Sequence, residues 1–416
     1  MEQMRENAKT IIKNIISENM PEAAVINALK NHDFGAKKIY LVAIGKAAWT
    51  MAKAATDYLQ IEKGIVITKY EHSMGEIPKV EIFESGHPTP DENTVIATKK
   101  AMELIENLTE NDYVLFLVSG GGSAIFEAPQ DGISLEDLTN LTKDLLASGA
   151  DIVEMNIVRK RLSKVKAGRF AELCKPASVF SVVLSDVLGD RLDTIASGPA
   201  APDMSTTEDA MSVVSKYSLK LTDTQKKYLK EETPKKLDNV QTVITGSVRS
   251  LCQSAAKSAQ ELGYKPYILT TMLNCEASEA GRFLSSIAID TVNGTNHFET
   301  PCAIIAGGET VVNLKGDGKG GRNQELALSA AVGISDLENI LIFSLGSDGT
   351  DGPTDAAGGI VDTKTIEQLK KLGFCPDKIL LNNDAYSGLK AVDSLIITGP
   401  TGTNVNDVSV ILCNKK

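Results

Sequence analysis

Residues 39–58 read IYLVAIGKAAWTMAKAATDY, and this stretch indicates the class of fold. Ile39–Ile44 is apolar at nearly every position, as expected of a strand that is buried on both faces of its sheet. A helical pattern over Lys46–Tyr58 follows directly. A strand that leads straight into a helix is the repeating unit of parallel α/β sheets.

The same alternation recurs along the chain, so we expect α/β architecture throughout. Further strands are expected at Gly64–Thr68, Val80–Glu84, Tyr113–Val118, Ser178–Leu184, Val240–Thr245, Pro266–Thr270, Cys302–Ala306, Ile340–Leu345, Leu395–Thr398 and Val408–Leu412. Further helices are expected at Glu92–Leu108, Leu135–Leu146, Val248–Leu262, Glu276–Val292, Arg322–Val332 and Lys364–Leu372. An amphipathic helical stripe near the start of the chain is formed by Met4, Ala8, Ile11, Ile12, Ile15 and Ile16.

Two domains are expected, because 416 residues exceed what one hydrophobic core usually supports. We place their boundary near Asp238, where a polar, strand-free segment from Ser197 ends in EETPKKLDN. Residues 1–238 are expected to hold a doubly wound, mostly parallel, Rossmann-like sheet, and residues 239–416 a second α/β domain. There, ETVVNLKGDGKGG follows closely on the strand Cys302–Ala306, which suggests a hairpin and therefore a mixed sheet.

Composition excludes several classes of protein. Lys and Arg number 43 against 54 Asp and Glu, a net charge of −11, so no broad basic face for nucleic acid is expected. The six cysteines form no C-x-x-C pair, which predicts reduced thiols and a cytoplasmic protein. The four histidines have no metal-ligand spacing, so a zinc site is not expected. No apolar run approaches the ~18 residues of a membrane span, so no membrane partner is expected.

Lys46 is the first candidate ligand-binding residue, because ligands of open α/β sheets bind beyond the carboxyl ends of the strands. It stands between a strand and a helix, where its charge adds to the partial positive charge of free N–H groups and suits a phosphate. The sequence is not a Walker A loop, since Tyr40 stands in place of the first glycine and Ala47 in place of Ser or Thr. The alternative is a surface lysine on the first helical turn.

A second candidate is VSGGGSAIFEAP, which follows the strand Tyr113–Val118. Gly120, Gly121 and Gly122 leave the backbone free to aim several N–H groups at one anion. A tight turn without a ligand is the alternative. Three consecutive glycines cost considerable chain entropy, which favours the functional interpretation.

Acidic clusters follow two further strands. The first comprises Asp186, Asp190 and Asp193 with Arg191, and the second comprises Asp348, Asp351 and Asp355. Carboxylates at strand ends can hold Mg²⁺ or take a proton from a hydroxyl group. Capping helices and filling turns is the commoner role of a single aspartate, so only one or two members of each cluster are expected to be functional.

The stretch GDGKGGRNQELALSA contains a formal G-x-G-x-x-G match at residues 316–321. A dinucleotide-binding fold would place an acidic residue at the end of the next strand, and Asp348 lies too far beyond it. The alternative is a mobile loop that brings Lys319 and Arg322 to a helix N-terminus. Arg322 could then grip a carboxylate or phosphoryl oxygen in bidentate fashion.

Together these loops favour phosphoryl transfer, which needs chiefly positioning, cations and Mg²⁺. Several stretches also resemble a known family and occur in its order: IGKAAWTMA, VSGGGSA, VLSDVLGDRLDTIASGPAAPD, GGETVV, GKGGRNQELAL, SLGSDGTDGPTDAAGG and LNNDAYSGLKAVDSLIITGPTGTNVNDV. The family is the class II glycerate kinases, the glycerate 2-kinases whose C-terminal part is called the MOFRL region. The resemblance implies two α/β domains with the active site in the cleft between them. It also implies ATP and D-glycerate as substrates and Mg²⁺ as the metal.

Within this resemblance, Lys46 matches the G-K-A lysine associated with ATP binding and catalysis, and Arg322 matches the arginine of the G-R-N-Q-E motif. The expected reaction is ATP-dependent phosphorylation of D-glycerate to 2-phospho-D-glycerate. Nucleotide phosphates are assigned to Lys46, Ser119, Gly120, Gly121, Gly122 and Ser123. Catalysis is assigned to Lys46, Arg322, Asp186 and Asp190, the last two also as metal ligands, and substrate binding to Arg322, Glu309, Asp348 and Asp351. The sequence leaves open which acidic cluster carries Mg²⁺ and which activates the hydroxyl group.

Three alternatives remain at this point. An NAD(P)H-dependent hydroxypyruvate reductase is supported only by the glycine pattern at residues 316–321. Phosphorylation could occur at the 3-hydroxyl, although a carboxylate clamp by Arg322 would hold the adjacent 2-hydroxyl more rigidly. A sensor would bind a small phosphorylated acid without turnover. A homodimer is compatible with the sequence, which does not determine the oligomeric state.

Overall fold

The computed structural model describes residues 1–415, and the chain divides into two compact units. The first unit comprises Ala24–Thr245, and the second comprises Gly246–Lys416 together with Met1–Ala23. The boundary expected near Asp238 is therefore wrong by a few residues, and the N-terminal segment belongs to the other unit. The boundary is displaced because strand β6 (Val240–Gly246) is hydrogen-bonded into the sheet of the first unit.

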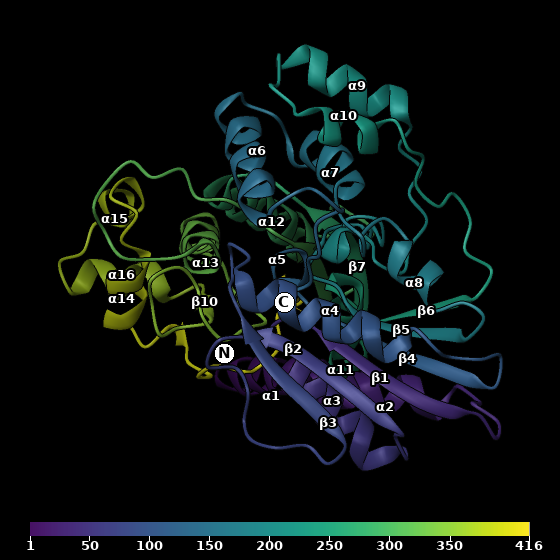
Figure 1. Cartoon of the computed structure of the whole chain (residues 1–416). Coiled ribbons are helices and arrows are strands. Elements are labelled where there is room, and N and C mark those ends of the chain that lie inside the picture. Colours follow the sequence, from purple (N-terminus) through teal and green to yellow (C-terminus); the bar gives the residue numbers. More distant parts are fainter. Residues whose placement is uncertain (416) are drawn as a thin grey trace. The chain divides into compact units, whose positions relative to one another are not determined.

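The first unit is built around a six-stranded sheet of order β3-β2-β1-β4-β5-β6 (Figure 1). Its strands are β1 (Lys38–Ile44), β2 (Lys63–Lys69), β3 (Val80–Ser85), β4 (Asp112–Val118), β5 (Ser178–Leu184) and β6. The pairs from β3 through β5 are parallel. This is the strand order of doubly wound sheets, in which the chain reverses its direction of winding between β1 and β4.

Helices cover both faces of this sheet. The helices that pack on the sheet are α2 (Pro21–Lys30), α3 (Ala48–Tyr58), α4 (Glu92–Ile105), α5 (Gly122–Ile125), α8 (Arg169–Leu173) and the 3₁₀ helix η1 (Ile195–Ser197). Four further helices pack against one another around a separate apolar cluster: α6 (Leu135–Ala147), α7 (Ile152–Arg161), α9 (Thr207–Lys216) and α10 (Asp223–Leu229). Alternate residues of β1 pack on opposite faces of the sheet. Val42 and Ile44 belong to one hydrophobic cluster, and Leu41 and Ala43 belong to another. This two-sided burial explains why β1 is apolar at nearly every position.

The second unit holds a six-stranded sheet of order β11-β10-β9-β12-β8-β7. Its strands are β7 (Lys265–Leu273), β8 (Cys302–Gly308), β9 (Ile340–Gly346), β10 (Gly358–Asp362), β11 (Leu395–Ile396) and β12 (Asp407–Cys413). The sheet is mixed, as expected, but the expected hairpin after β8 is wrong. Strands β7 and β8 pair in parallel, and the other pairs are antiparallel. Two of the antiparallel pairs form because the C-terminal strand β12 inserts between β8 and β9.

The helices of the second unit are α1 (Glu2–Glu18), α11 (Val248–Glu261), α12 (Ala277–Asn293), α13 (Arg322–Ile334), α14 (Thr365–Lys371), α15 (Pro376–Leu381) and α16 (Ala385–Ala391). The stripe that includes Ile11 and Ile15 is buried, as its spacing predicted. Polar contacts also fix α1 in this unit, since Arg5 pairs with Asp362 at 2.7 Å and Asn14 donates to Ser258 at 2.9 Å.

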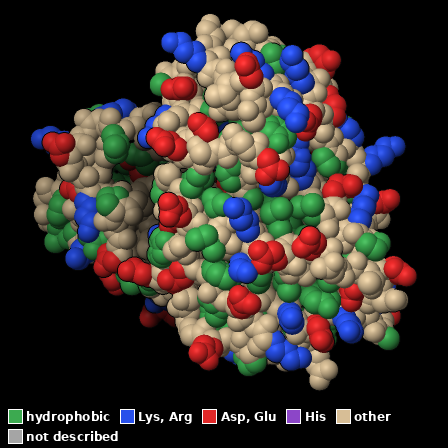
Figure 2. All heavy atoms as spheres, viewed as in Figure 1, with side chains coloured by type: hydrophobic (Ala, Val, Ile, Leu, Met, Phe, Trp, Pro, Cys, Tyr) green, Lys and Arg blue, Asp and Glu red, His purple; other side chains and the backbone are tan. Residues whose placement is uncertain are grey.

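Apart from the second strand of the hairpin expected after β8, all the expected strands and helices occur, with ends that differ by a few residues. Strand β10 was missed because its sequence, GGIVD, is short and begins with two glycines, which are poor strand formers. No helix among residues 1–415 is long and apolar enough to cross a membrane. Figure 2 shows acidic and basic side chains interspersed over the face in view, rather than gathered into one basic area.

Candidate functional site

The two anion-binding loops predicted from the sequence form one structure in the first unit. Both leave the carboxyl ends of adjacent strands, β1 and β4. The Lys46 N–H donates to the Gly120 carbonyl at 2.9 Å, and the Ser119 N–H donates to the Ile44 carbonyl at 3.0 Å. The Ala47 N–H donates to Ser119 Oγ at 3.0 Å, so this hydroxyl group joins the loops rather than facing a ligand. The loops meet between β1 and β4, the topological switch point at which doubly wound sheets bind ligands.

The glycines of this loop are required by close approach. A Cβ atom on Gly120 would overlap the Asp186 carboxylate, so Asp186 lies directly against the loop. Gly121 has φ +85°, and a Cβ atom there would be 3.0 Å from the His87 ring and 3.3 Å from Lys46 Cγ. The structure thus brings Lys46, the glycine loop and Asp186 together, as the sequence predicted, and adds His87.

Two histidines of this site were missed by the sequence reasoning. His72 Nδ1 lies 3.0 Å from the Lys46 carbonyl oxygen. Burial lowers the pKa of His87, and the charges of Lys46, Lys69 and His72 lower it further. The loop therefore lies in a basic environment. Their positions carried a signal, since His72 follows β2 and His87 follows β3, and residues beyond the carboxyl ends of parallel strands lie at the ligand-binding edge.

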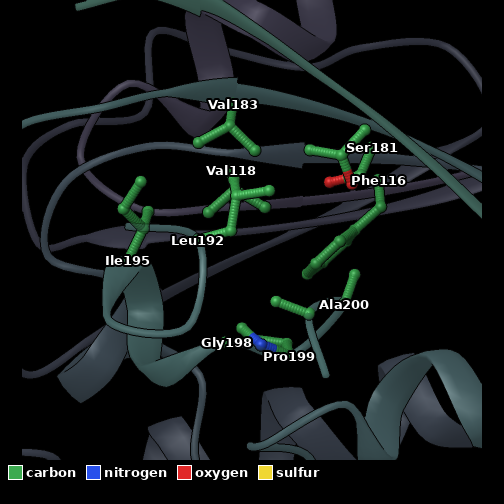
Figure 3. A pocket seen from close by; sticks show the side chains of 11 residues that line it. Phe116, Val118, Ser181, Val183, Leu192, Ile195, Gly198, Pro199 and Ala200 are labelled. Carbon is green, nitrogen blue, oxygen red and sulfur yellow. The ribbon is translucent and has the colours of Figure 1, made fainter. Parts of the chain in front are cut away.

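A strained segment supports the far side of the glycine loop. Ala196 and Ser197 both have positive φ, +51° and +62°, which is unusual for residues with a side chain. The Ser197 and Ser123 hydroxyl groups lie 3.0 Å apart. Figure 3 shows Leu192 and Ile195, which flank this segment, pointing toward side chains of the sheet. Apolar packing therefore helps to hold a backbone conformation that costs about 1–3 kcal/mol per residue, a feature that clusters at functional sites.

The other aspartates of the first cluster have different partners. Asp193 accepts two hydrogen bonds from Arg191, at 3.2 and 2.8 Å, and lies 3.8 Å from Lys160. Asp190 occupies a turn with φ +53°. Among residues 1–415, no group of three His, Cys, Asp or Glu side chains is arranged to hold a metal ion. Asp186 lies against the glycine loop, and its single carboxylate still fits Mg²⁺, which commonly binds one or two carboxylates together with substrate phosphates.

Arg322 is the main candidate site residue of the second unit. It begins α13, and its fork donates to both oxygens of Asp407 at 2.6 and 3.1 Å. A third hydrogen bond, of 2.8 Å, reaches Glu309. Burial lowers the pKa of Arg322, but the stronger combined effect of Asp407, Glu309 and Asp351 raises it, so the side chain stays charged. The bidentate contact that was expected for a substrate is made with Asp407 instead. Together with the contact to Glu309 it occupies three of the five guanidinium N–H groups, so two remain for a ligand.

The second acidic cluster does not form one site. Asp351 is buried and accepts hydrogen bonds from the backbone of Asn323 and Gln324, at 3.2 and 2.8 Å, so it caps the N-terminus of α13. Burial raises the pKa of Asp351 to about 6. Asp348 closes its own turn by accepting from the Thr350 N–H at 2.9 Å. Both nevertheless line one open pocket of about 880 Å³ in this unit, together with Arg322.

The glycine-rich loop at residues 316–321 borders the same pocket. Asn383 Oδ1 accepts from the N–H groups of Lys315 and Gly316, and the Asn382 carbonyl accepts from Gly318. The loop is thus fixed to the turn at Asn382–Asp384, and several residues separate it from the end of β8. A dinucleotide-binding turn would follow its strand directly. Gly316 and Gly318 are instead explained by the close packing of this loop on the Asn382–Asp384 turn.

A carboxyl pair at this pocket was also missed. Burial raises the pKa of Glu325 to about 7, a hydrogen bond from Asn383 opposes the shift, and the neighbouring Glu276 carboxyl group adds to it. The positive charge of Lys315 lowers the pKa of both carboxyl groups. A carboxyl group that titrates near neutral pH in a pocket can exchange a proton with a substrate. Its sequence signal was only a glutamate inside GRNQE, whose partner Glu276 stands 49 residues earlier in the chain.

Comparison with known proteins defines the family. A model described as "Domain of unknown function (DUF4147)" matches residues 7–230, and the MOFRL family model matches residues 302–407. The chain is 52% identical over 411 residues to D-glycerate 2-kinase of Thermotoga maritima, with 98% of each chain covered. It is 43% identical to glycerate 2-kinase of Pyrococcus horikoshii, with 99% of this chain and 98% of that one covered.

One relative carries a different name. An Agrobacterium vitis protein, provisionally named a hydroxypyruvate reductase, is 36% identical, with 98% of this chain and 94% of that one covered. A crystal structure of glycerate kinase from Thermotoga maritima matches 99% of this chain and 100% of its own, with a TM-score of 0.95. The protein is therefore a kinase and belongs to the glycerate kinase family that carries a C-terminal MOFRL region.

Proposed function

We propose that the protein transfers the γ-phosphoryl group of ATP, with Mg²⁺, to the 2-hydroxyl group of D-glycerate. The observation that carries the proposal is the joining of the Lys46 loop to the glycine loop at the switch point of a doubly wound sheet. Backbone N–H groups of Gly121–Ser123 and the Lys46 ammonium group would bind the nucleotide phosphates. Lys69 adds positive charge where an anion is to be bound, since its charge and that of Lys46 both act on His87.

Mg²⁺ bound with the nucleotide would neutralise charge on the phosphate oxygens. Asp186 would hold it, and the support for this role is that Asp186 lies directly against Gly120. Asp190 and Asp193 are less suited, the latter because Arg191 and Lys160 already neutralise it.

Arg322 would receive the glycerate carboxylate or the transferring phosphoryl group through its two remaining N–H groups. Asp407 and Glu309 hold the guanidinium plane in place, so an anion would meet an oriented donor. Asp351 would act indirectly, since it caps the helix that carries Arg322. Glu325 is suited to accept the hydroxyl proton, because its pKa lies near 7.

Coupling the product to enolase tests the reaction and its regiochemistry together. With ATP, Mg²⁺ and D-glycerate, phosphoenolpyruvate should form at the rate of ATP consumption without phosphoglycerate mutase. Formation only after addition of the mutase would mean that the 3-hydroxyl group is phosphorylated.

Hydroxypyruvate reduction is the second candidate, because a 36% identical relative bears that name. Incubation with hydroxypyruvate and NADH or NADPH, followed by absorbance, separates the two activities. We expect no oxidation of either nucleotide, since the glycine loop at residues 316–321 is bound to the Asn382–Asp384 turn. We also propose a cytoplasmic location, because all six cysteines are free thiols.

A further inference from the structure

Lys166 is a buried ammonium group that contacts the glycine loop from the protein interior. Its Nζ atom donates to the Ser123 carbonyl at 2.8 Å and to the Phe126 carbonyl at 3.0 Å. Glu127 lies 3.5 Å away, and the Lys166 and Glu127 side chains are 0% and 4% exposed. Placing an ammonium group in the interior is costly unless it is paired and hydrogen-bonded. Lys166 therefore has a role that an apolar side chain would not fill.

The contacts of Lys166 fall on the short helix that follows the glycines of the loop. Helix α5 (Gly122–Ile125) is a single turn, too short to be stable by itself. The carbonyl groups at the end of such a helix lack partners within it and need capping. Lys166 caps the Ser123 and Phe126 carbonyls, and a cation at a helix C-terminus is favourable. The direction of the N–H groups at the start of α5 depends on this turn.

Lys166 is itself fixed in position through its neighbours. The Ala167 N–H donates to the Ser197 carbonyl at 3.1 Å, and the Gly168 N–H donates to the Gly198 carbonyl at 2.7 Å. Ser197 in turn contacts Ser123 through their hydroxyl groups. The segment that carries Lys166 and the strained segment at Ser197 therefore hold the same loop from two sides.

We propose that Lys166 is a positioning residue that keeps the Gly120–Ser123 loop in the conformation that binds nucleotide phosphates. The proposal rests on the nucleotide-binding function proposed for this loop. Lys166 does not touch the nucleotide, since its three donors are directed at carbonyl and carboxylate oxygens beneath the loop. Its removal should weaken nucleotide binding and leave glycerate binding nearly unchanged.

A dependence on pH distinguishes this role from a merely structural one. Burial lowers the pKa of Lys166 to about 8, Glu127 opposes the shift, and the charges of Arg159 and Lys160 add to it. Above pH 8 the ammonium group loses a proton, so its hold on the loop and on Glu127 weakens. Because the pKa of Lys166 is lower in the folded than in the unfolded state, its contribution to folding stability increases as the pH rises above 8. Nucleotide affinity and that stability contribution should therefore move in opposite directions.

The test compares Lys166→Met with Lys164→Met as a matched control, since Lys164 pairs with Asp131 at the surface. We expect Lys166→Met to raise KM for ATP at least tenfold and KM for glycerate less than twofold, and to abolish the fall in ATP affinity near pH 8. Lys164→Met should resemble the wild type. Unchanged ATP affinity in folded Lys166→Met, or equal increases in both KM values, would overturn the proposal.

Glu127→Gln provides a second variant if Lys166→Met does not fold. Without the Glu127 charge, the pKa of Lys166 should fall further, so the loss of ATP affinity should move to lower pH. An unmoved profile would overturn the proposal. Calorimetric titration with ATP measures affinity without turnover, so Lys166 can be tested even if glycerate is not the acceptor. Absence of ATP binding by the wild type would overturn both proposals.

Discussion

Replacing Arg322 with alanine should destabilise the second unit as well as remove activity. The change deletes three hydrogen bonds, two to Asp407 and one to Glu309. The two carboxylates differ in environment, because the Asp407 side chain is 9% exposed and that of Glu309 is 42% exposed. Glu309 can be solvated by water when Arg322 is lost, whereas Asp407 remains a buried charge without its main partner.

The cost can be estimated from this difference. Removing one partner of a fully buried ion pair costs about 3–5 kcal/mol. The Arg322 side chain is itself 34% exposed, so part of this cost is screened, and we expect about 2–3 kcal/mol near pH 7.5. Burial raises the pKa of Asp407 even though Arg322 opposes the shift, so loss of Arg322 should raise it further. When the pKa of a carboxyl group is higher in the folded than in the unfolded state, stability falls as the pH rises from the unfolded-state pKa to the folded-state pKa. The deficit should therefore be smaller at pH 5.

Urea unfolding of the full chain at pH 7.5 and pH 5 measures this deficit. Adding Asp407→Asn to Arg322→Ala should recover most of the lost stability, because no buried charge then remains. Arg282→Ala serves as the control, since Arg282 pairs with Glu279 at the surface and its loss should cost less than about 0.5 kcal/mol. A deficit that is equal at both pH values and unaffected by Asp407→Asn would refute the reasoning.

The same variants separate stability from activity. If the stable Arg322→Ala, Asp407→Asn double variant stays inactive, Arg322 acts on the substrate. Arg322→Lys should be nearly as inactive as Arg322→Ala, because lysine keeps the charge but cannot bond Asp407 and Glu309 as a planar fork. Substantial activity in Arg322→Lys would show that only the charge matters.

Three further outcomes are expected. Lys46→Ala should lower kcat/KM by about 10²–10³ without changing the melting temperature, because it removes a cation from the phosphate site; steady-state kinetics with normal turnover would exclude this role. Gly120→Ala should weaken ATP binding at least tenfold, measured by calorimetry, because its methyl group would displace Asp186; unchanged affinity would show that the loop can move freely. Ile11→Ala should cost about 2–4 kcal/mol in urea unfolding of the second unit, because Ile11 is buried in α1, whereas exposed Ile96→Ala in the first unit should cost little; equal small costs would mean that α1 does not stabilise the second unit.

Much of the secondary structure and part of the candidate site could be predicted from local sequence. Apolar runs reveal two-sided burial, and helical spacing reveals a packed face, because both are local consequences of backbone geometry. Lys46, Gly120 and Asp186 were found because each follows a strand, and the carboxyl ends of parallel strands share one edge of a sheet. Applied to every strand, the same rule would have found His72 and His87.

Which residues contact one another depends on how the strands and helices pack in three dimensions. Asp407 bonds Arg322 across 85 positions of the chain because β12 enters the sheet between β8 and β9, and no local pattern specifies that order. Helix α1 packs in the unit of the C-terminal half because its apolar stripe is buried there, although nothing in the stripe names its partner. Asp351 caps α13, and Lys166 donates to carbonyl groups of the glycine loop. Neither contact is local in sequence, so neither could be predicted from the residues around it. Local sequence reports whether a residue is buried, whereas its partners depend on the order in which strands pair.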